Sequence, residues 1–115
     1  MFAFENLEVY KKARHVHTII YQLTKDLNSI PRYTTEQLGR ASLSIMLNIA
    51  EGSAKIGEKD RRKFYVIARG SVFECASLIQ FLNDEKELST AVSANLLSNY
   101  DELSRMLFVM IRKLS

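Results

Sequence analysis

Four stretches of this 115-residue sequence repeat apolar residues every three or four positions, and only short breaks separate them. That spacing matches the 3.6-residue period of an α-helix, which places such residues on one face. No stretch alternates apolar and polar residues for long enough to predict a strand. Helices joined by short loops must lie antiparallel to their sequence neighbours. We therefore predict an all-α fold, an antiparallel up-down-up-down four-helix bundle.

The breaks give the expected bounds of the helices. The first helix is predicted from about 6 to 28, because Pro31 disfavours helical geometry in the residue before it. Thr34 and Gln37 have the spacing of a capping box, so the second helix is expected to open there and to end at a loop over 52–57. The third is expected over about 58–83, and the fourth from about 89 or 90 to the end of the sequence.

Length and composition fit a single domain over residues 1–115. Charged residues of both signs make up 25% of the chain, which excludes the disordered class, and four Gly with one Pro argue against a turn-rich all-β fold. The first residues lack the apolar segment of a signal peptide, and no window approaches the ~20 apolar residues of a membrane span. With one cysteine, Cys75, the sequence predicts a cytoplasmic protein with no membrane association.

Polar residues interrupt the apolar stripes of the second and third helices. They are Arg40, Ser44, Asn48 and Glu51 on the second helix and Gly70, Ser71 and Glu74 on the third. Counting outward from the loop brings Arg40 level with Gly70, where a glycine would let the helices approach closely. We therefore expect a buried or half-buried ion pair between Arg40 and Glu74. Glu51 is expected to clamp the turn by facing Lys59 and Arg62.

This polar cluster has two interpretations. It is a catalytic or binding constellation, or it is a core network that fixes the register of the two helices. The second interpretation is favoured, because no second carboxylate, metal ligand or nucleophile converges on the pair. Removing one partner of a buried ion pair would then cost about 3 to 5 kcal/mol.

The residues of common catalytic and metal sites are not arranged to work together. His15 and His17 are two apart on a helix, so they cannot chelate one metal as an i, i+4 pair would. The glycines at 52 and 57 have the spacing of a phosphate-binding loop, but Glu58 stands where that motif needs lysine. Cys75 lies in an apolar run typical of a buried thiol. The sequence predicts no catalytic residue, metal, cofactor or small-molecule substrate, and hence no enzyme.

Basic residues are the remaining signal. The net charge is +3, and it divides into +2 for residues 1–57, +2 for 58–83 and −1 for 84–115. Such a surface binds nucleic acid through phosphates in a salt-dependent way, although charge runs are most often solvated faces. The candidate phosphate contacts are Lys11, Lys12, Arg14, Lys55, Lys59, Arg61, Arg62 and Lys63.

Three segments carry a resemblance to a known family. These are FENLEVYKKA at 4–13, RASLSIMLNIAEGSAK at 40–55 and DRRKFYVIARGSVFEC at 60–75. They resemble the four-helix bundle proteins encoded by intervening sequences of bacterial 23S ribosomal RNA genes, also called the S23 ribosomal protein family. Met46 stands where many members have a proline before NIAEG, and the stretch from 31 to 40 is about one helical turn shorter than in many relatives.

The resemblance implies a cytoplasmic bacterial protein with no established enzymatic activity. A related branch, the accessory variability determinant of diversity-generating retroelements, is a basic homopentamer that engages nucleic acid and a reverse transcriptase. By analogy we expect a homo-oligomer, a pentamer, with RNA or DNA and a protein as partners; the alternative is a structural or protein-interaction module without nucleic-acid binding. The expected structural polar network is Arg40, Ser44, Asn48, Glu51, Arg69, Ser71 and Glu74, of which Arg69 alternatively serves an interface between subunits.

Overall fold

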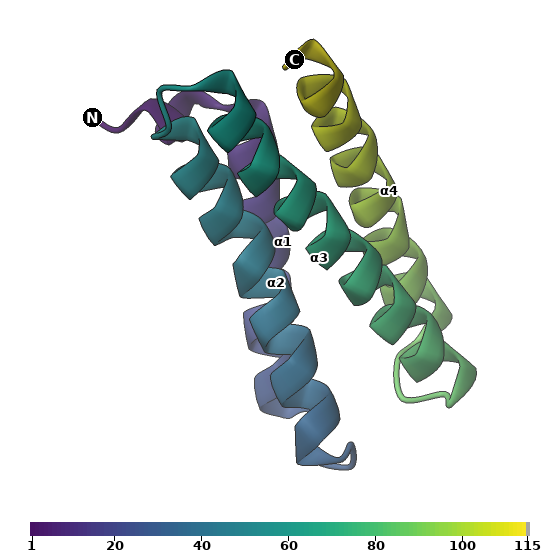
Figure 1. Cartoon of the computed structure of the whole chain (residues 1–115). Helices are drawn as coiled ribbons and strands as arrows, with labels where there is room; N and C mark the ends of the chain where they lie inside the picture. The colour runs from purple at the N-terminus through teal and green to yellow at the C-terminus, as the bar shows by residue number, and fades with distance from the viewer. Residues whose placement is uncertain (115) are drawn as a thin grey trace.

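The computed structural model describes residues 1–114 and shows four long helices (Figure 1). A short 3-10 turn, η1, precedes them over Ala3–Asn6. The helices are α1 (Glu8–Asp26), α2 (Arg32–Ser53), α3 (Glu58–Asp84) and α4 (Thr90–Lys113), and the described residues form no strand. The predicted all-α four-helix bundle is confirmed.

Consecutive helices run in opposite directions, so both termini and the α2–α3 loop lie at one end of the bundle, which we call the upper end (Figure 1). The α1–α2 and α3–α4 connections lie at the lower end. The packing of α2 on α3 is the most extensive, followed by α3 on α4 and α1 on α2, and the contact between α1 and α4 is the smallest. The α2–α3 hairpin is therefore the best-packed unit of the molecule.

The core is built from one apolar stripe on each helix. On α1 the sequence pattern predicts a stripe of Val9, Ala13, Val16, Ile20, Leu23 and Leu27, and the first four of these are buried. The sequence pattern predicts an inner face of α3 made of Phe64, Ile67, Ala68, Ser71, Glu74, Cys75, Leu78 and Leu82. Ala68, Cys75 and Leu82 are buried as predicted, and each of the others lies one position before a buried residue. Ile67 and Glu74 are exposed, and the buried residues are Tyr65, Ala68, Val72, Cys75, Ile79 and Leu82. These six follow spacings of three and four throughout, which is the seam of a helix packed between two neighbours.

Helix α2 begins two residues earlier than the capping box predicts. It starts at Arg32, directly after Pro31, whose φ of −53° is already close to helical geometry. Thr34 is buried inside the first turn, where its backbone nitrogen donates to the Pro31 carbonyl oxygen at 3.0 Å. No side chain caps this helix, and Gln37 bonds to α3 instead. The capping box is therefore wrong, because the proline supplies the start signal.

The connection between α3 and α4 is fixed by local hydrogen bonds. Lys86 adopts a left-handed conformation with φ 60°, and the following backbone nitrogen, of Glu87, donates to the Leu82 carbonyl oxygen at 2.9 Å. This is the pattern of a Schellman helix end, which usually uses glycine. Ser89 then caps α4, because its side-chain oxygen accepts from the Val92 backbone nitrogen at 3.1 Å. The predicted start of the fourth helix is confirmed.

Gly52, and not Gly70, permits the close approach of α2 and α3. A Cβ on Gly52 would lie 2.8 Å from Tyr65 Cε1 and 3.0 Å from Phe64 Cβ. A Cβ on Gly70 would meet nothing within 4 Å, so the predicted approach at that position is wrong. The two helices are thus drawn together beside the α2–α3 loop, which fixes the start of α3.

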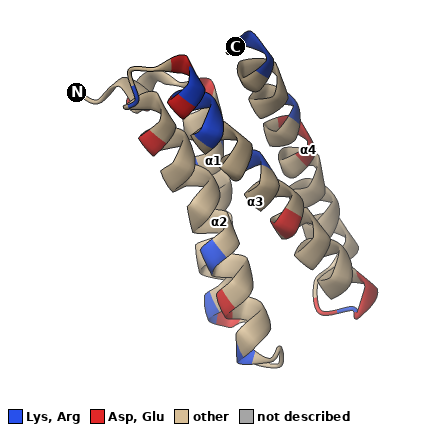
Figure 2. Cartoon of the chain, viewed as in Figure 1, with Lys and Arg blue, Asp and Glu red and all other residues tan. Residues whose placement is uncertain are grey.

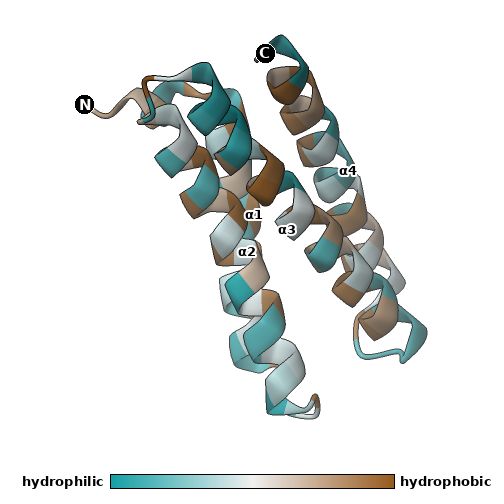
Figure 3. Cartoon of the chain, viewed as in Figure 1, coloured by the Kyte–Doolittle hydropathy of each residue, from teal (hydrophilic) through white to brown (hydrophobic). Residues whose placement is uncertain are grey.

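By length and composition α3 is the one helix of residues 1–114 apolar enough to cross a membrane. In Figure 3 its first turns are hydrophilic and a hydrophobic turn follows them. It supplies six buried residues to the core and packs against both α2 and α4. Core helices of globular proteins share this composition, and 39% of its apolar window is buried inside the bundle.

Candidate functional site

A small polar network joins α2 to α3 at mid-height. The Ser44 and Ser71 hydroxyl oxygens lie 2.9 Å apart, and Asn48 Nδ2 donates to the Ser44 carbonyl oxygen at 2.8 Å and to its hydroxyl oxygen at 3.0 Å. All three side chains are half-buried. The structure brings these three predicted residues together, and both hydroxyl groups and the Asn48 amide nitrogen are hydrogen-bonded, as is usual for polar groups removed from water.

The structure contradicts the expected ion pair between Arg40 and Glu74. Both side chains are exposed, and they form no ion pair with each other. Glu74 instead accepts a hydrogen bond from Gln37 Nε2. Arg40 has no hydrogen-bond or ion-pair partner among residues 1–114. No buried charge therefore lies between these helices.

Helix geometry explains the error. Residues four apart on an α-helix are turned by about 40° from one another, so the column Asn48, Ser44, Arg40 winds away from α3 by about 80°. Gln37 and Ser44 are seven residues apart, so they lie on nearly the same face of α2, the face toward α3. The register of α2 against α3 also differs from the one obtained by counting residues outward from the α2–α3 loop. Gly52 packs on Tyr65, nearly two turns into α3, because the chain must first cross the end of α2.

The clamp expected at the α2–α3 turn uses a different residue. Glu51 is exposed and forms no ion pair with Lys59 or Arg62. Arg61 holds the turn, since its Nη2 donates to the Lys55 carbonyl oxygen at 2.9 Å. Arg61 is thus half-buried and committed to the loop rather than directed to solvent.

The candidate phosphate contacts on α1 differ in availability. Lys12 is held between α1 and α4, with Nζ 2.9 Å from Glu102 Oε2 and 2.9 Å from Asn99 Oδ1, and its side chain is 20% exposed. Lys11 pairs with Glu8 at 3.2 Å. Arg14 is exposed and has no ion-pair partner among the described residues. Two of the three charges are therefore already neutralised by a carboxylate.

The candidates at the start of α3 are freer. Lys59, Arg62 and Lys63 are exposed and form no ion pair within residues 1–114. Lys55 lies in the loop, with Nζ 5.1 Å from the centroid of the Phe64 ring. Figure 2 shows Lys and Arg together with Asp and Glu over the first turns of α3, Lys and Arg at the end of α4, and Asp and Glu at the α3–α4 connection, so basic residues are in excess at the upper end. The molecule is thus polarised, with a basic upper end.

Arg69 does not belong to the α2–α3 network. Its Nε donates to the Ser104 carbonyl oxygen on α4 at 3.2 Å. Its guanidinium carbon lies 4.8 Å from the Phe73 ring centroid and 5.3 Å from that of Phe108. Arg69 therefore joins α3 to α4. The sequence shows Val66, Arg69 and Phe73 at spacings of three and four, which places them on one face of α3.

The remaining titratable groups are built into the core. Burial raises the pKa of the Cys75 thiol to about 12, so it stays protonated at neutral pH. His17 is half-buried, with Nδ1 2.9 Å from Ser42 Oγ, and burial lowers its pKa. Within the described part of the chain, no group of three or more His, Cys, Asp or Glu residues could hold a metal ion.

The fold and the site define a class: a small antiparallel four-helix bundle with a polar α2–α3 seam and a basic upper end. Residues 5–109 match the family described as 23S rRNA-intervening sequence protein, and the chain belongs to this family. It is also similar to a crystal structure of a protein with unknown function from the S23 ribosomal protein family of Bacteroides thetaiotaomicron VPI-5482. The two share 20% identity with a TM-score of 0.86, over 90% of this chain and 97% of that one. No curated protein matches the chain.

Proposed function

We propose that this bundle is a non-enzymatic cytoplasmic protein that associates with RNA or other nucleic acid through phosphate contacts at its upper end. The observation that carries the proposal is the set of exposed cations without carboxylate partners at the start of α3: Lys59, Arg62 and Lys63. An unpaired cation releases a phosphate counterion on binding without first breaking an ion pair. Asp84, Glu85 and Glu87 at the opposite end would repel the same ligand.

The test compares two charge-reversal variants of the full chain. The first is Arg62→Glu with Lys63→Glu at the upper end. The second is Lys25→Glu with Arg40→Glu, which makes the same change in net charge away from that end. Arg61 is left intact because it holds the loop.

Fluorescence anisotropy with a labelled RNA hairpin, at low and high salt, gives the readout. The upper-end variant should weaken binding and reduce the slope of log Kd against log salt by about two, at close to one per lost phosphate contact. The control variant should change the slope by less than one. No binding at low salt by the unaltered protein would end the proposal, as would equal losses in both variants.

We also propose a homo-oligomer, on a separate observation. The outer face of α2 exposes Leu43 and Leu47, at 39% and 53%, and a hollow lined by Phe2, Phe4 and Leu47 lies beside them. Neighbouring exposed apolar residues are typical of protein interfaces. Light scattering after gel filtration should give a multiple of 13.2 kDa, and Leu47→Glu should lower it. A monomeric mass for the unaltered protein would remove this part of the proposal.

A further inference from the structure

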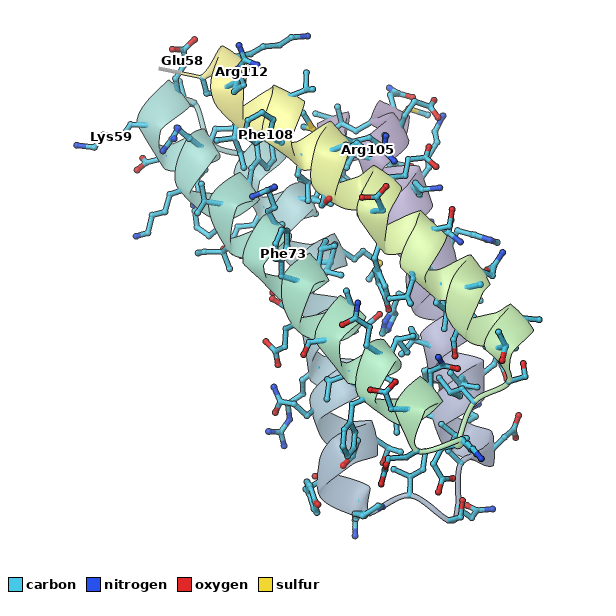
Figure 4. All side chains as sticks on the ribbon, turned by 90° about the vertical axis from the view of Figure 1, so that its right-hand side faces the viewer. Glu58, Lys59, Phe73, Arg105, Phe108 and Arg112 are labelled. Carbon is cyan, nitrogen blue, oxygen red and sulfur yellow. The ribbon has the colours of Figure 1, made fainter. Side chains whose placement is uncertain are left out.

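A groove between α3 and α4 combines aromatic rings with arginines. It has a volume of about 480 Å³ and is lined from α3 by Arg62, Val66, Arg69, Gly70 and Phe73 and from α4 by Phe108 and Ile111. Phe73 is 56% exposed and Phe108 is 45% exposed. In Figure 4 the two residues come from the two helices and lie along the line where these meet. None of the described lining residues is acidic.

The two rings are held in place rather than left to move. The Arg69 guanidinium packs on both, at 4.8 and 5.3 Å from their centroids, and its Nε bond to the Ser104 carbonyl oxygen fixes that guanidinium. The guanidinium carbon of Arg112 also lies near Phe108, 5.7 Å from the ring centroid. Each ring therefore presents a preorganised surface with a positive charge beside it, which reduces the entropy lost on binding.

The groove is continuous with the basic upper end. Lys59, Arg62, Val66, Arg69 and Phe73 follow one another at spacings of three and four, so they share one stripe of α3. Arg105, Phe108 and Arg112 form the facing stripe of α4, and Figure 4 shows them on the same side of the molecule as Lys59 and Phe73. A chain bound at the upper end could pass directly into the groove.

We infer that this groove binds unpaired nucleotides, whose bases stack on Phe73 and Phe108 while Arg62 and Arg112 contact the flanking phosphates. The inference rests on the proposed function and adds to it a preference for single-stranded over duplex RNA. Rings beside arginines suit a ligand that is planar and anionic at once. An apolar partner would have to bury the guanidinium groups without an acidic residue to pair them, which is unfavourable.

Gly70 supports this use of the groove. A Cβ at this position would meet nothing within 4 Å, and the residue is exposed and lines the groove. The glycine therefore leaves room that a larger side chain would fill. This gives a variant, Gly70→Leu, that narrows the groove without changing its charge or its rings.

The test measures affinity for a labelled 12-nucleotide oligouridine and for an RNA duplex of equal length. The variants are Phe73→Leu with Phe108→Leu, which keeps apolar volume but removes the rings, and Gly70→Leu. Phe81→Leu is the control, since Phe81 lies on the same helix and is 53% exposed but lies outside the groove. Circular dichroism establishes that each variant is folded.

Loss of one stacked base weakens binding by roughly 5- to 150-fold, so the double variant should lose at least tenfold affinity for the oligouridine. Gly70→Leu should also lose affinity, whereas Phe81→Leu should not, and binding to the duplex should change less than twofold in all variants. Equal binding of both RNAs, or equal losses for both, would overturn the inference and leave the proposed function intact. Failure to bind either RNA at low salt would overturn both. A change in the mass of the RNA-free double variant by light scattering would assign the groove to contacts between copies, and would also overturn the inference.

Discussion

Replacing Gly52 by alanine should destabilise the bundle, although alanine is the better helix former. Alanine in a helix gains about 1 kcal/mol over glycine in the interior, and less in the last turn, where Gly52 lies. Against this gain, the new Cβ would lie 2.8 Å from Tyr65 Cε1 and 3.0 Å from Phe64 Cβ. Tyr65 is 4% exposed, and Phe64 Cβ is attached directly to the backbone, so neither atom can move away freely.

Inserting a methyl group into such a contact costs about 1 to 3 kcal/mol. The expected net change is therefore a loss of about 0.5 to 2 kcal/mol in the free energy of unfolding. The matched control is Gly39→Ala on the same helix, where a Cβ meets nothing within 4 Å. That variant should gain about 0.5 to 1 kcal/mol through helix propensity alone.

Urea unfolding followed by circular dichroism gives both free energies, and thermal melts should separate the two variants by about 4 °C per kcal/mol at this chain length. The difference between the two variants isolates the steric contact from propensity. If they agree within about 0.5 kcal/mol, α2 and α3 can separate at no cost, and the close approach does not fix the start of α3.

Three further predictions concern the polar groups of the bundle. Burial raises the pKa of Cys75 from 9.0 to about 12, so between these pH values the folded protein keeps a proton that the unfolded chain loses. The free energy of unfolding should therefore fall by up to about 4 kcal/mol as the pH rises from 9 to 12. In Cys75→Ala this fall should be smaller, as measured by urea unfolding at a series of pH values. Replacing Ser44 and Ser71 by alanine, singly and together, should give a coupling energy of about 0.5 to 1 kcal/mol in a double-mutant cycle, and additive effects would mean that their 2.9 Å contact is not stabilising. Arg40→Gln should change the free energy of unfolding by less than about 0.5 kcal/mol, because the side chain is exposed and unpaired; a loss near 3 kcal/mol would restore the buried pair with Glu74.

The architecture could be predicted from the sequence because it depends on the period and spacing of apolar residues. Four stripes and three short breaks leave few alternatives to an up-down-up-down bundle, and the stripe of α1 was placed correctly. The stripe of α3 is predicted only in part: Ala68, Cys75 and Leu82 are buried, but Tyr65, Val72 and Ile79 are not foreseen, because α3 packs on both α2 and α4 and carries apolar residues around most of its circumference. Val66, Ile67 and Phe73 are exposed beside a core that uses Tyr65, Ala68 and Val72. Hydrophobicity alone cannot choose between stripes one position apart.

Pairing between helices was less predictable, since it depends on where two helices come closest. The sequence identified Ser44, Asn48 and Ser71 as neighbours. This prediction holds despite a small error in the register of the two helices, because short polar side chains occupy successive turns. The prediction of an ion pair between Arg40 and Glu74 required the register of α2 against α3 to be correct within one residue, and that prediction is wrong. The contact of Gly52 with Tyr65 sets that register, and it is not apparent before the tyrosine is placed in the core.

The number of basic residues without a carboxylate partner says more about the binding surface than the net charge does. A net charge of +3 is small, and Lys12, one of the candidate phosphate contacts on α1, forms an ion pair with Glu102. Lys59, Arg62 and Lys63 form no ion pair among the described residues, although Glu58 and Asp60 lie in the same first turns of α3. Lys59 and Arg62 lie on the stripe of α3 that continues to the Phe73 and Phe108 groove, so one face of two helices carries both the charge and the rings on which the proposed binding of single-stranded RNA rests.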